Sequence, residues 1–454
     1  MKFVQYYLDC LSHASYLIGD ESTGQAVVVD PRRDIGDYLD DAAAAGMRID
    51  YVIETHVHAD FVSGHLELAD AAGATIIYGA AADVHVPHRK VVDGDRIALG
   101  DVVLEFRATP GHTPESISVV VWATRAATTP DCVLTGDTLF VGDVGRPDLC
   151  SSTGRSAHDM ARQLHRSLHG RLLTLPDDTR VYPAHGAGSA CGKNLSTATV
   201  STIGEQRRTN YALQLRTVEE FVHAVTQGQP PPPDYFAHVA ALNRDPHQLA
   251  RDDHLPYVSL DDIVTYQARG AVVLDVRSPD AFARAHLRGS LNVGLEGRFA
   301  EHAHDVAGVD DSIVLVCEHG RAHEARVRLS RVGLDAVIGA LEQPAAAFAH
   351  HPDIIATARR LTTHQLAAAR HQIADLVLLD VRGHGERADG YIEDSTHIPI
   401  DQLRRRANEL DPTRPLVAYC AGGYRSSIAA SLLRAHAFHN ASDLTGGYQA
   451  WTTR

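Results

Sequence analysis

The chain has 454 residues, and at the usual size of about 100 to 200 residues per domain this length predicts three domains. Its 42 basic and 57 acidic residues give a formal net charge of −15, and no basic run is longer than Arg404-Arg405-Arg406, so neither nucleic acid nor an anionic membrane surface is expected as a partner. No apolar run approaches the ~20 residues that span a bilayer, and Asp9 interrupts the N-terminus before the apolar core of a signal sequence could form, so we expect a cytoplasmic protein.

Apolar runs in the first part of the chain predict alternating strands and helices. The Ala-rich stretch from Ile35 to Ala45, ended by Gly46, predicts a helix. Residues 1–245 are therefore expected to form one α/β domain. Its strands are expected at Ala26–Asp30, Tyr51–Ile53, Thr75–Tyr78, Val102–Ala108 and Ile117–Trp122.

The loop 55–64 holds the first concentration of side chains that bind metals. It follows the strand that ends at Ile53, and loops at strand ends are where sites are commonly built. It contains His56, His58 and Asp60 in the spacing His-x-His-x-Asp. The motifs that follow are Gly111-His112-Thr113, Thr135-Gly136-Asp137 and Ala184-His185-Gly186.

These motifs resemble those of the metallo-β-lactamase superfamily, and as a set they resemble its persulfide dioxygenase branch. The resemblance implies a four-layer αβ/βα sandwich and a single Fe(II) held by His56, His112 and Asp137. Two histidines and one carboxylate leave positions open on the metal, which suits non-haem Fe(II) and oxygen activation. The residues then expected to orient ligands or ordered water are His58, Asp60 and His185.

Phe61 stands where the two-metal hydrolases of this superfamily, such as glyoxalase II, carry a further histidine. Its side chain has no lone pair, so the sequence predicts one metal in this domain. Two alternatives stay open: a thioester hydrolase of the glyoxalase II type, and a non-catalytic sulfur carrier or sensor.

A Gly-rich loop follows His185 and contains Cys191. Glutathione-using dioxygenases typically carry Asp and Tyr after this histidine, whereas this chain has Gly186, which argues against glutathione as the thiol. The arrangement resembles bacterial fusion proteins that join a persulfide dioxygenase to rhodanese domains. The six cysteines of the chain lack CxxC spacing, so neither a zinc ribbon nor a disulfide framework is indicated. Cys191 either contacts the substrate thiol or is a loop cysteine without a role.

Two segments of the second half repeat one another, beyond the Pro-rich stretch 229–234 that we interpret as a stiff spacer. Val272–Arg277 matches Leu376–Arg382 around a shared Asp-Val-Arg, and each copy continues with a helix, a strand, a cysteine and a helix. That alternation predicts parallel α/β units. Both copies resemble rhodanese domains, over residues 257–345 and 360–454.

The second copy carries Cys420-Ala421-Gly422-Gly423-Tyr424-Arg425, followed by a helix predicted to open at Ser426. Glycines let backbone N–H groups face one point and a helix N-terminus adds partial positive charge, so a thiolate or persulfide is favoured at Cys420. The other loop residues are expected to bind the sulfur substrate. In the first copy, the loop 317–321 has one glycine and places Glu318 beside Cys317, which predicts an inactive, structural copy.

By these resemblances we expect an enzyme that uses Fe(II) and O2 to oxidise a low-molecular-weight thiol persulfide to sulfite and the free thiol. Sulfane sulfur carried on Cys420 would pass to sulfite and form thiosulfate, in sulfide detoxification or sulfur metabolism. The sequence leaves open the physiological thiol, the order of sulfur transfer and the oligomeric state, a homo-oligomer included.

Overall fold

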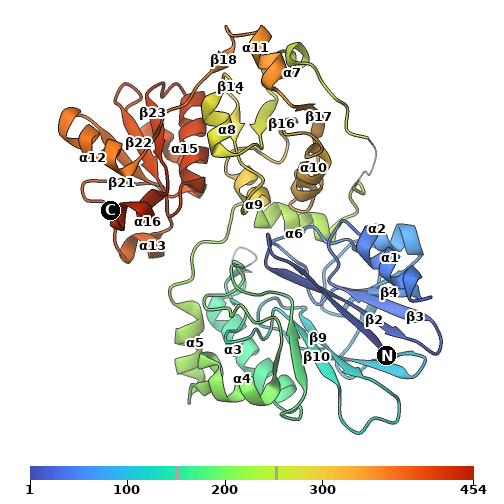
Figure 1. Cartoon of the computed structure of the whole chain (residues 1–454). Coiled ribbons are helices and arrows are strands. Elements are labelled where there is room, and N and C mark those ends of the chain that lie inside the picture. The colour runs from blue at the N-terminus through green and yellow to red at the C-terminus, as the bar shows by residue number, and fades with distance from the viewer. Residues whose placement is uncertain (150–153, 251–253, 454) are drawn as a thin grey trace. The chain divides into compact units, whose positions relative to one another are not determined.

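The computed structural model describes residues 1–149, 154–250 and 254–453. The chain divides into two compact units, Met1–Arg251 and Asp252–Arg454, and the colours of Figure 1 run from blue to green in the first and on to red in the second. The finer domain limits drawn from the sequence, at residues 245, 257, 345 and 360, stay predictions.

Within its described residues, the first unit contains two six-stranded sheets. The first sheet consists of β1 (Lys2–Leu8), β2 (His13–Asp20), β3 (Gln25–Val29), β4 (Arg48–Ile53), β5 (Thr75–Gly79) and β6 (Arg89–Val91). The second consists of β7 (Arg96–Leu99), β8 (Val102–Ala108), β9 (Ile117–Trp122), β10 (Cys132–Gly136), β11 (Arg180–Pro183) and β12 (Ser201–Thr202). β1 to β3 pair antiparallel and β3 to β6 parallel, whereas the second sheet is antiparallel except between β10 and β11.

Helices cover the outer face of each sheet. Because side chains alternate along a strand, Val27 and Val29 of β3 pack toward the second sheet while Ala26 and Val28 pack toward helices. The predicted four-layer αβ/βα sandwich is therefore confirmed. The first sheet is covered by α1 (Gly36–Ala44) and α2 (His65–Ala72), as Figure 1 shows, and the second by α3 (Ala157–Ser167), α4 (Ile203–Thr209) and α5 (Val218–Thr226), with the short η2 (Leu168–Leu172) and η3 (Tyr211–Gln214).

Helix α6 (Phe236–Arg244) follows the Pro-rich stretch 229–234 and belongs to the first unit. Its buried Asn243 donates hydrogen bonds to the carbonyl oxygens of His58 and Phe61, at 2.9 and 2.8 Å. The Pro-rich stretch therefore lies inside the first unit and does not separate the two units as a spacer would. It precedes a helix that packs on the loop 55–64.

The second unit contains two repeats, each built on a parallel sheet. The sheet of the first repeat consists of β13 (Val272–Asp275), β15 (Leu291–Asn292), β16 (Ile313–Cys317) and β17 (Val337–Glu342). That of the second consists of β19 (Arg360–Leu361), β20 (Val377–Asp380), β21 (Thr396–His397), β22 (Leu416–Tyr419) and β23 (Ala441–Leu444). Neighbouring strands are parallel throughout both sheets, in the orders β15-β13-β16-β17 and β19-β23-β22-β20-β21, which confirms the predicted architecture.

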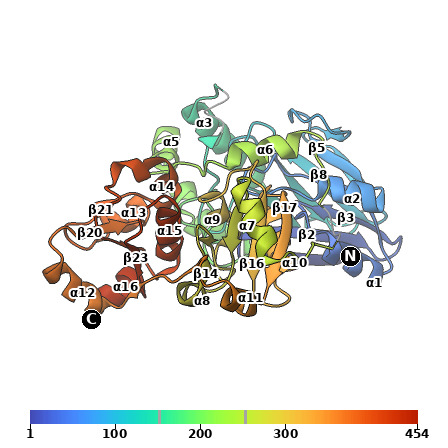
Figure 2. The same ribbon diagram turned by 90° about the horizontal axis from the view of Figure 1, so that it is seen from above.

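Helix α15 (Tyr424–Ala435) packs against β22 and β23 of its own repeat and against β15 of the other, and Figure 2 shows it on the side of its sheet that faces the first repeat. The remaining helices of the first repeat are α7 (Leu260–Ala268), α8 (Pro279–Arg284), α9 (Phe299–His304), α10 (Ala322–Ser330) and α11 (Ala345–His350). Those of the second are α12 (Thr363–Gln372), α13 (His384–Ala388), α14 (Ile400–Arg406), η4 (Ala407–Glu409) and α16 (Gly447–Thr452), and the antiparallel pair β14 (His286–Leu287) and β18 (Ile355–Ala356) lies apart from both sheets.

The shared Asp-Val-Arg has the same structural role in both repeats. Arg277 Nε donates to Asp275 Oδ1 at 2.9 Å, and Arg382 Nε donates to Asp380 Oδ1 at 3.0 Å. In each case the arginine backbone N–H also donates to that oxygen, at 3.1 Å. The motif therefore fixes the turn that follows a buried strand.

Candidate metal centre and sulfurtransferase loop

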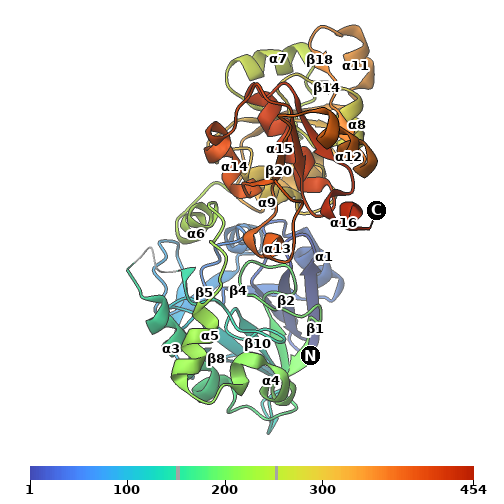
Figure 3. The ribbon, with the colours of Figure 1, turned by 90° about the vertical axis from the view of Figure 1, so that its left-hand side faces the viewer.

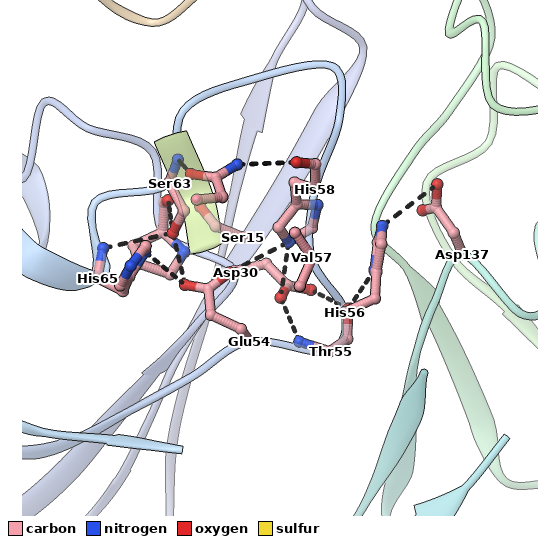
Figure 4. A network of polar contacts seen from close by, with 12 residues as sticks. Ser15, Asp30, Glu54, Thr55, His56, Val57, His58, Ser63, His65 and Asp137 are labelled. Carbon is pink, nitrogen blue, oxygen red and sulfur yellow. Dashed lines mark hydrogen bonds and ion pairs between the residues drawn. The ribbon is translucent and has the colours of Figure 1, made fainter. Parts of the chain in front are cut away.

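Asp30, the residue that follows β3, holds the start of the loop 55–64. Its carboxylate accepts hydrogen bonds from Thr55 N at 2.7 Å and Thr55 Oγ1 at 2.9 Å, and its Oδ1 lies 3.0 Å from His58 Nε2. Figure 4 shows these contacts as one network. Buried polar contacts from a neighbouring strand end thus set the position of the loop.

The structure brings His56, His112 and Asp137 together from the ends of β4, β8 and β10. One potential ligand atom from each lies within 4.8 Å of the others, and all three side chains are buried. Asp137 Oδ2 lies 3.4 Å from His112 Nε2 and 3.9 Å from His56 Nε2. Two ring nitrogens and one carboxylate oxygen therefore face a common point.

Hydrogen bonds leave the Nε2 lone pairs of both histidines free to face that point. His112 Nδ1 donates to the carbonyl oxygen of Arg146 at 2.9 Å. His56 Nδ1 donates to Thr55 Oγ1 at 3.0 Å, since that hydroxyl gives its own hydrogen to Asp30. A proton fixed on Nδ1 leaves Nε2 as the acceptor, which is the form that binds metals.

Asp137 Oδ2 is buried and has no hydrogen-bond partner among the described residues. Burial alone would raise the pKa of Asp137, but His185, His112 and His56 outweigh it and hold the pKa well below its usual range. Burial lowers the pKa of His56 well below its usual range, so that ring is neutral. An anionic oxygen without a hydrogen-bond partner, faced by two ring nitrogens, fits a divalent cation.

His58 points away from this cluster toward two acids. Its Nε2 lies 3.0 Å from Asp30 Oδ1 and 3.3 Å from Glu54 Oε2, as Figure 4 shows. Burial lowers the pKa of His58, but both carboxylates outweigh it and raise the pKa well above its usual range. Burial raises the pKa of Glu54 to about 7. His58 therefore lies beside the cluster as a charged partner of two buried acids, and its role in orienting neighbouring groups stays a prediction.

Asp60, His185 and Cys191 form a second buried cluster, with potential ligand atoms within 4.8 Å of one another. His185 Nδ1 lies 2.7 Å from Asp137 Oδ1, and His185 Nε2 lies 2.7 Å from Asp60 Oδ2. Although burial lowers the pKa of His185, the two acids raise it to about 10. Burial, followed by Asp60 and Asp137, raises the pKa of the Cys191 thiol well above its usual range. The Gly-rich loop thus places its cysteine beside His185 and Asp60.

Phe61 and His13 pack beside the two donor clusters, and the sequence analysis did not identify His13. Phe61 is fully buried, with its ring centroid 4.0 Å from that of His13 and 4.4 Å from that of His58. His13, on β2, pairs with His185 through an isolated β-bridge, and burial lowers its pKa well below the usual range. No motif marks His13. Asp30 and Glu54 were also missed, although an acid directly after a buried parallel strand is a usable signal.

In the second unit, Cys420 directly follows β22. Gly423 N donates to Cys420 Sγ at 3.1 Å, and Sγ lies 3.7 Å from Ser426 Oγ. Gly447 must be glycine, because a Cβ there would lie 2.3 Å from the Cys420 carbonyl oxygen and its φ is +56°. Helix α15 begins at Tyr424, two residues earlier than predicted, since Gly423 at φ +96° already turns the chain into the helix.

The corresponding cysteine of the first repeat has different surroundings. Gly320 N donates to Glu342 Oε2 at 3.0 Å, and Cys317 Sγ lies 3.9 Å from the carbonyl oxygen of Leu341. Burial, then Glu342, raises the pKa of Cys317 to about 12. The adjacent Glu318, on which the sequence argument relied, contributes less than burial.

Comparison with known proteins finds relatives for both units. Residues 8–185 match the family model of the metallo-beta-lactamase superfamily, and residues 259–343 and 362–454 match that of the rhodanese-like domain. The human protein "Persulfide dioxygenase ETHE1, mitochondrial" is 34% identical over 216 residues, which are 46% of this chain and 74% of that protein. Hydroxyacylglutathione hydrolase of Methylococcus capsulatus (strain ATCC 33009 / NCIMB 11132 / Bath) is 36% identical over 173 residues, 37% of this chain and 60% of that protein.

Among solved structures, a metallo-beta-lactamase from Staphylococcus aureus subsp. aureus COL superposes with a TM-score of 0.68 at 31% identity, covering 75% of this chain and 98% of that one. Together with the donor clusters, these relatives imply a bound metal and sulfur-containing small-molecule substrates. No helix in the described part of the chain is both long and apolar enough to cross a membrane.

Proposed function

Because the chain belongs to the metallo-β-lactamase superfamily, among relatives of the persulfide dioxygenases, and carries two rhodanese-like domains, we propose that it is a persulfide dioxygenase joined to a sulfurtransferase. The substrate is the persulfide of a low-molecular-weight thiol. Its outer sulfur gives four electrons to O2 and becomes sulfite, with two oxygen atoms from O2 and the third from water, while the S–S bond breaks and the thiol is released. This reaction would serve the oxidation of sulfide in the cell.

We propose that His56, His112 and Asp137 hold one Fe(II). The observation that carries this is the buried, unpartnered Oδ2 of Asp137, faced by the Nε2 lone pairs of both histidines. When bound, iron supplies the redox chemistry that lets O2 react with a persulfide sulfur. The protein groups keep two neutral rings and one anionic carboxylate directed at the ion.

In the second unit, Cys420 carries the transferred sulfur as a persulfide. Sulfite attacks the outer sulfur, a new S–S bond forms in thiosulfate, and the S–S bond to Cys420 breaks with its electron pair returning to the thiolate. The Gly423 N–H at 3.1 Å from Sγ supports this role, because it donates toward a developing negative charge.

The test is oxygen uptake by iron-loaded protein given several thiol persulfides, with iron content measured on the same samples. His112→Ala and Asp137→Ala should lose both iron and oxygen uptake. Sulfur transfer from thiosulfate to cyanide should stay intact in these variants, which shows that the second unit is folded, and circular dichroism of the same samples checks the first. Full oxygen uptake in either variant would remove that residue from the ligand set.

A thioester hydrolase is the second candidate, and two observations favour it. The hydroxyacylglutathione hydrolase relative aligns over 173 residues, and Asp60, His185 and Cys191 form a second buried donor cluster. This function requires two metal ions and hydrolysis of a glutathione thioester. Two zinc ions per chain together with thioester turnover and no oxygen uptake would establish it in place of the dioxygenase.

A further inference from the structure

A cavity of about 620 Å³ lies between the two repeats of the second unit. Its wall from the first repeat comes from the segment 296–302, which includes the start of α9, and its wall from the second includes Glu386, Asp401 and Arg425. Figure 3 shows α9 and α14, which carry parts of the two walls. Neither repeat encloses this space alone.

The two repeats are joined by buried hydrogen bonds beside the cavity. Tyr424 Oη donates to the carbonyl oxygen of Gly294 at 2.6 Å. Ser427 Oγ donates to Asn292 Oδ1 at 2.8 Å, and Asn292 N donates to Ser431 Oγ at 2.9 Å. Asn292 and both serines are buried. These hydrogen bonds of α15 therefore fix the two cavity walls relative to one another.

The cavity borders the loop of Cys420, because Tyr424 and Arg425 are both loop residues and lining residues. Arg425 is held by Glu386 through two hydrogen bonds of 2.7 Å each. Burial lowers the pKa of Arg425, but Glu386 and then Cys420 outweigh it and raise the pKa. The guanidinium thus lies near the sulfur nucleophile, with its charge already matched by a carboxylate.

The other lining charges leave the cavity negative. Arg298 pairs with Glu301 at 2.5 Å. Glu296 lies 3.5 Å from Arg321 but is 89% exposed, so that pair is weak. Asp401 is exposed to solvent and forms no salt bridge with any described residue, and partial burial followed by Asp305 raises its pKa. His302, another titratable lining group, is paired with Asp305 at 2.7 Å.

We propose that this cavity is a site at which small thiols, as a second class of acceptor beside sulfite, take sulfur from Cys420, and that Asp401 and Glu296 make it select thiols bearing an ammonium group over thiols bearing a carboxylate. The inference rests on the proposed function of Cys420. The acceptor thiolate attacks the outer sulfur of the Cys420 persulfide and forms the S–S bond of a new small-molecule persulfide. The enzyme S–S bond breaks, and its electron pair returns to Cys420 with no net oxidation.

Three acceptors of nearly equal size test whether the cavity selects thiols by charge. They are cysteamine, 2-mercaptoethanol and 3-mercaptopropionate, which carry charges of +1, 0 and −1 in addition to the thiol. The full chain is loaded with sulfur from thiosulfate, and the KM of each acceptor is measured. Asp401→Asn should raise the KM of cysteamine by about three- to fivefold relative to that of 3-mercaptopropionate. The matched control is Asp375→Asn, which removes an exposed acid of the same repeat outside the cavity and should leave the ratio unchanged. A ratio that Asp401→Asn does not change would overturn the proposal.

A probe that cannot react separates failure of the site from failure of the proposed function. 2-(Methylthio)ethylamine should slow alkylation of Cys420 by iodoacetamide, whereas 3-(methylthio)propionate should not, and Asp401→Asn should remove the difference. If Cys420 takes up no sulfur from thiosulfate, the proposed function of Cys420 is wrong, and this protection still decides what the cavity binds. Equal protection by both probes, or by neither, would contradict the selection of an ammonium group.

Discussion

At the scale of single residues, Thr55 links His56 of the candidate metal cluster to the buried carboxylate of Asp30. Its hydroxyl accepts from His56 Nδ1 at 3.0 Å and donates to Asp30 Oδ2 at 2.9 Å. The hydroxyl therefore selects the tautomer of His56 that presents Nε2 to the metal position.

Thr55→Val should weaken iron binding by about 10- to 100-fold, the usual effect of removing a group that orients a metal-binding histidine. Thr55→Ser keeps the hydroxyl and is the matched control, so its iron affinity should stay near that of the wild type. Competition with a calibrated chelator measures both. Equal affinities for the valine and serine variants would mean that the Asp30–Thr55–His56 chain does not orient the ring.

His286 makes the free energy of unfolding depend on pH, independently of the metal centre. It is buried in the first repeat, stacks on Phe282 with ring centroids 3.9 Å apart, and donates from Nδ1 to the Phe282 carbonyl oxygen at 2.9 Å. Burial lowers its pKa to about 4. Between about pH 6.5 and 4 the unfolded chain therefore binds a proton that the folded chain does not, so the free energy of unfolding falls as pH falls through this window.

His286→Gln should remove about 2 kcal/mol of this pH dependence between pH 7 and 4.5. Urea denaturation of both proteins at the two pH values measures the difference. His371→Gln, at an exposed position of α12, is the control and should keep the wild-type dependence. Parallel pH profiles for the His286 variant and the wild type would contradict the assignment.

Sequence motifs located the residues of the central cluster but not the residues that support it. His56, His112 and Asp137 each stand in a motif, and the structure brings their potential ligand atoms within 4.8 Å. His13 and Asp30 stand in none, because their positions depend on which strands become neighbours. Such support becomes visible only when the sheet order is known.

At the scale of elements, the apolar runs of the sequence predicted where strands lie but did not predict contacts between distant segments. β8 and β9 have the predicted bounds, Val102–Ala108 and Ile117–Trp122, because β-branched and aromatic residues recur through both segments. Helix α6 was not predicted at all. Its defining contacts join Asn243 to the loop 55–64, far away in the sequence, and no local pattern encodes them.

Asn243→Asp tests whether α6 holds the metal loop. An aspartate can still accept from Ser63 N, as Asn243 Oδ1 does at 2.9 Å, but it cannot donate to the carbonyl oxygens of His58 and Phe61. Loss of these buried bonds should lower the free energy of unfolding of the first unit by about 1–3 kcal/mol and weaken iron binding. Calorimetry with and without iron measures both effects.

Ala241→Ser, at an exposed position of the same helix, is the control for changes in α6 itself and should change neither quantity. An Asn243→Asp protein that loses stability but keeps its iron affinity would show that α6 supports the fold without setting the loop.

At the scale of the whole molecule, one chain carries a site proposed to make sulfite and a site proposed to consume it. If the two work in series, protein given a thiol persulfide should release mainly thiosulfate. Cys420→Ser keeps the side-chain size, but a serine hydroxyl cannot carry a persulfide. Oxygen uptake should persist in this variant while sulfite accumulates.

Early time points and low substrate concentrations are needed for this measurement, because sulfite also reacts with free persulfide without catalysis. Sulfite and thiosulfate are quantified together in the wild type, in Cys420→Ser and in Cys317→Ser, the matched change in the first repeat. Thiosulfate formation at the wild-type rate in Cys420→Ser would show that the sulfurtransferase serves another acceptor.

The position of α15 between two sheets has a consequence for how this chain can change over evolution. The first repeat can lose the chemistry of its own cysteine loop without harm to Cys420, because the residues that hydrogen-bond α15, Asn292 and Gly294, lie outside the loop 317–321. Its sheet edge is different: Asn292 bonds Ser427 and Ser431 directly. If a gene kept only the second repeat, the side of α15 that packs against β15 would be exposed to solvent. Selection can therefore retain the first repeat for the packing of α15, whatever the reactivity of Cys317.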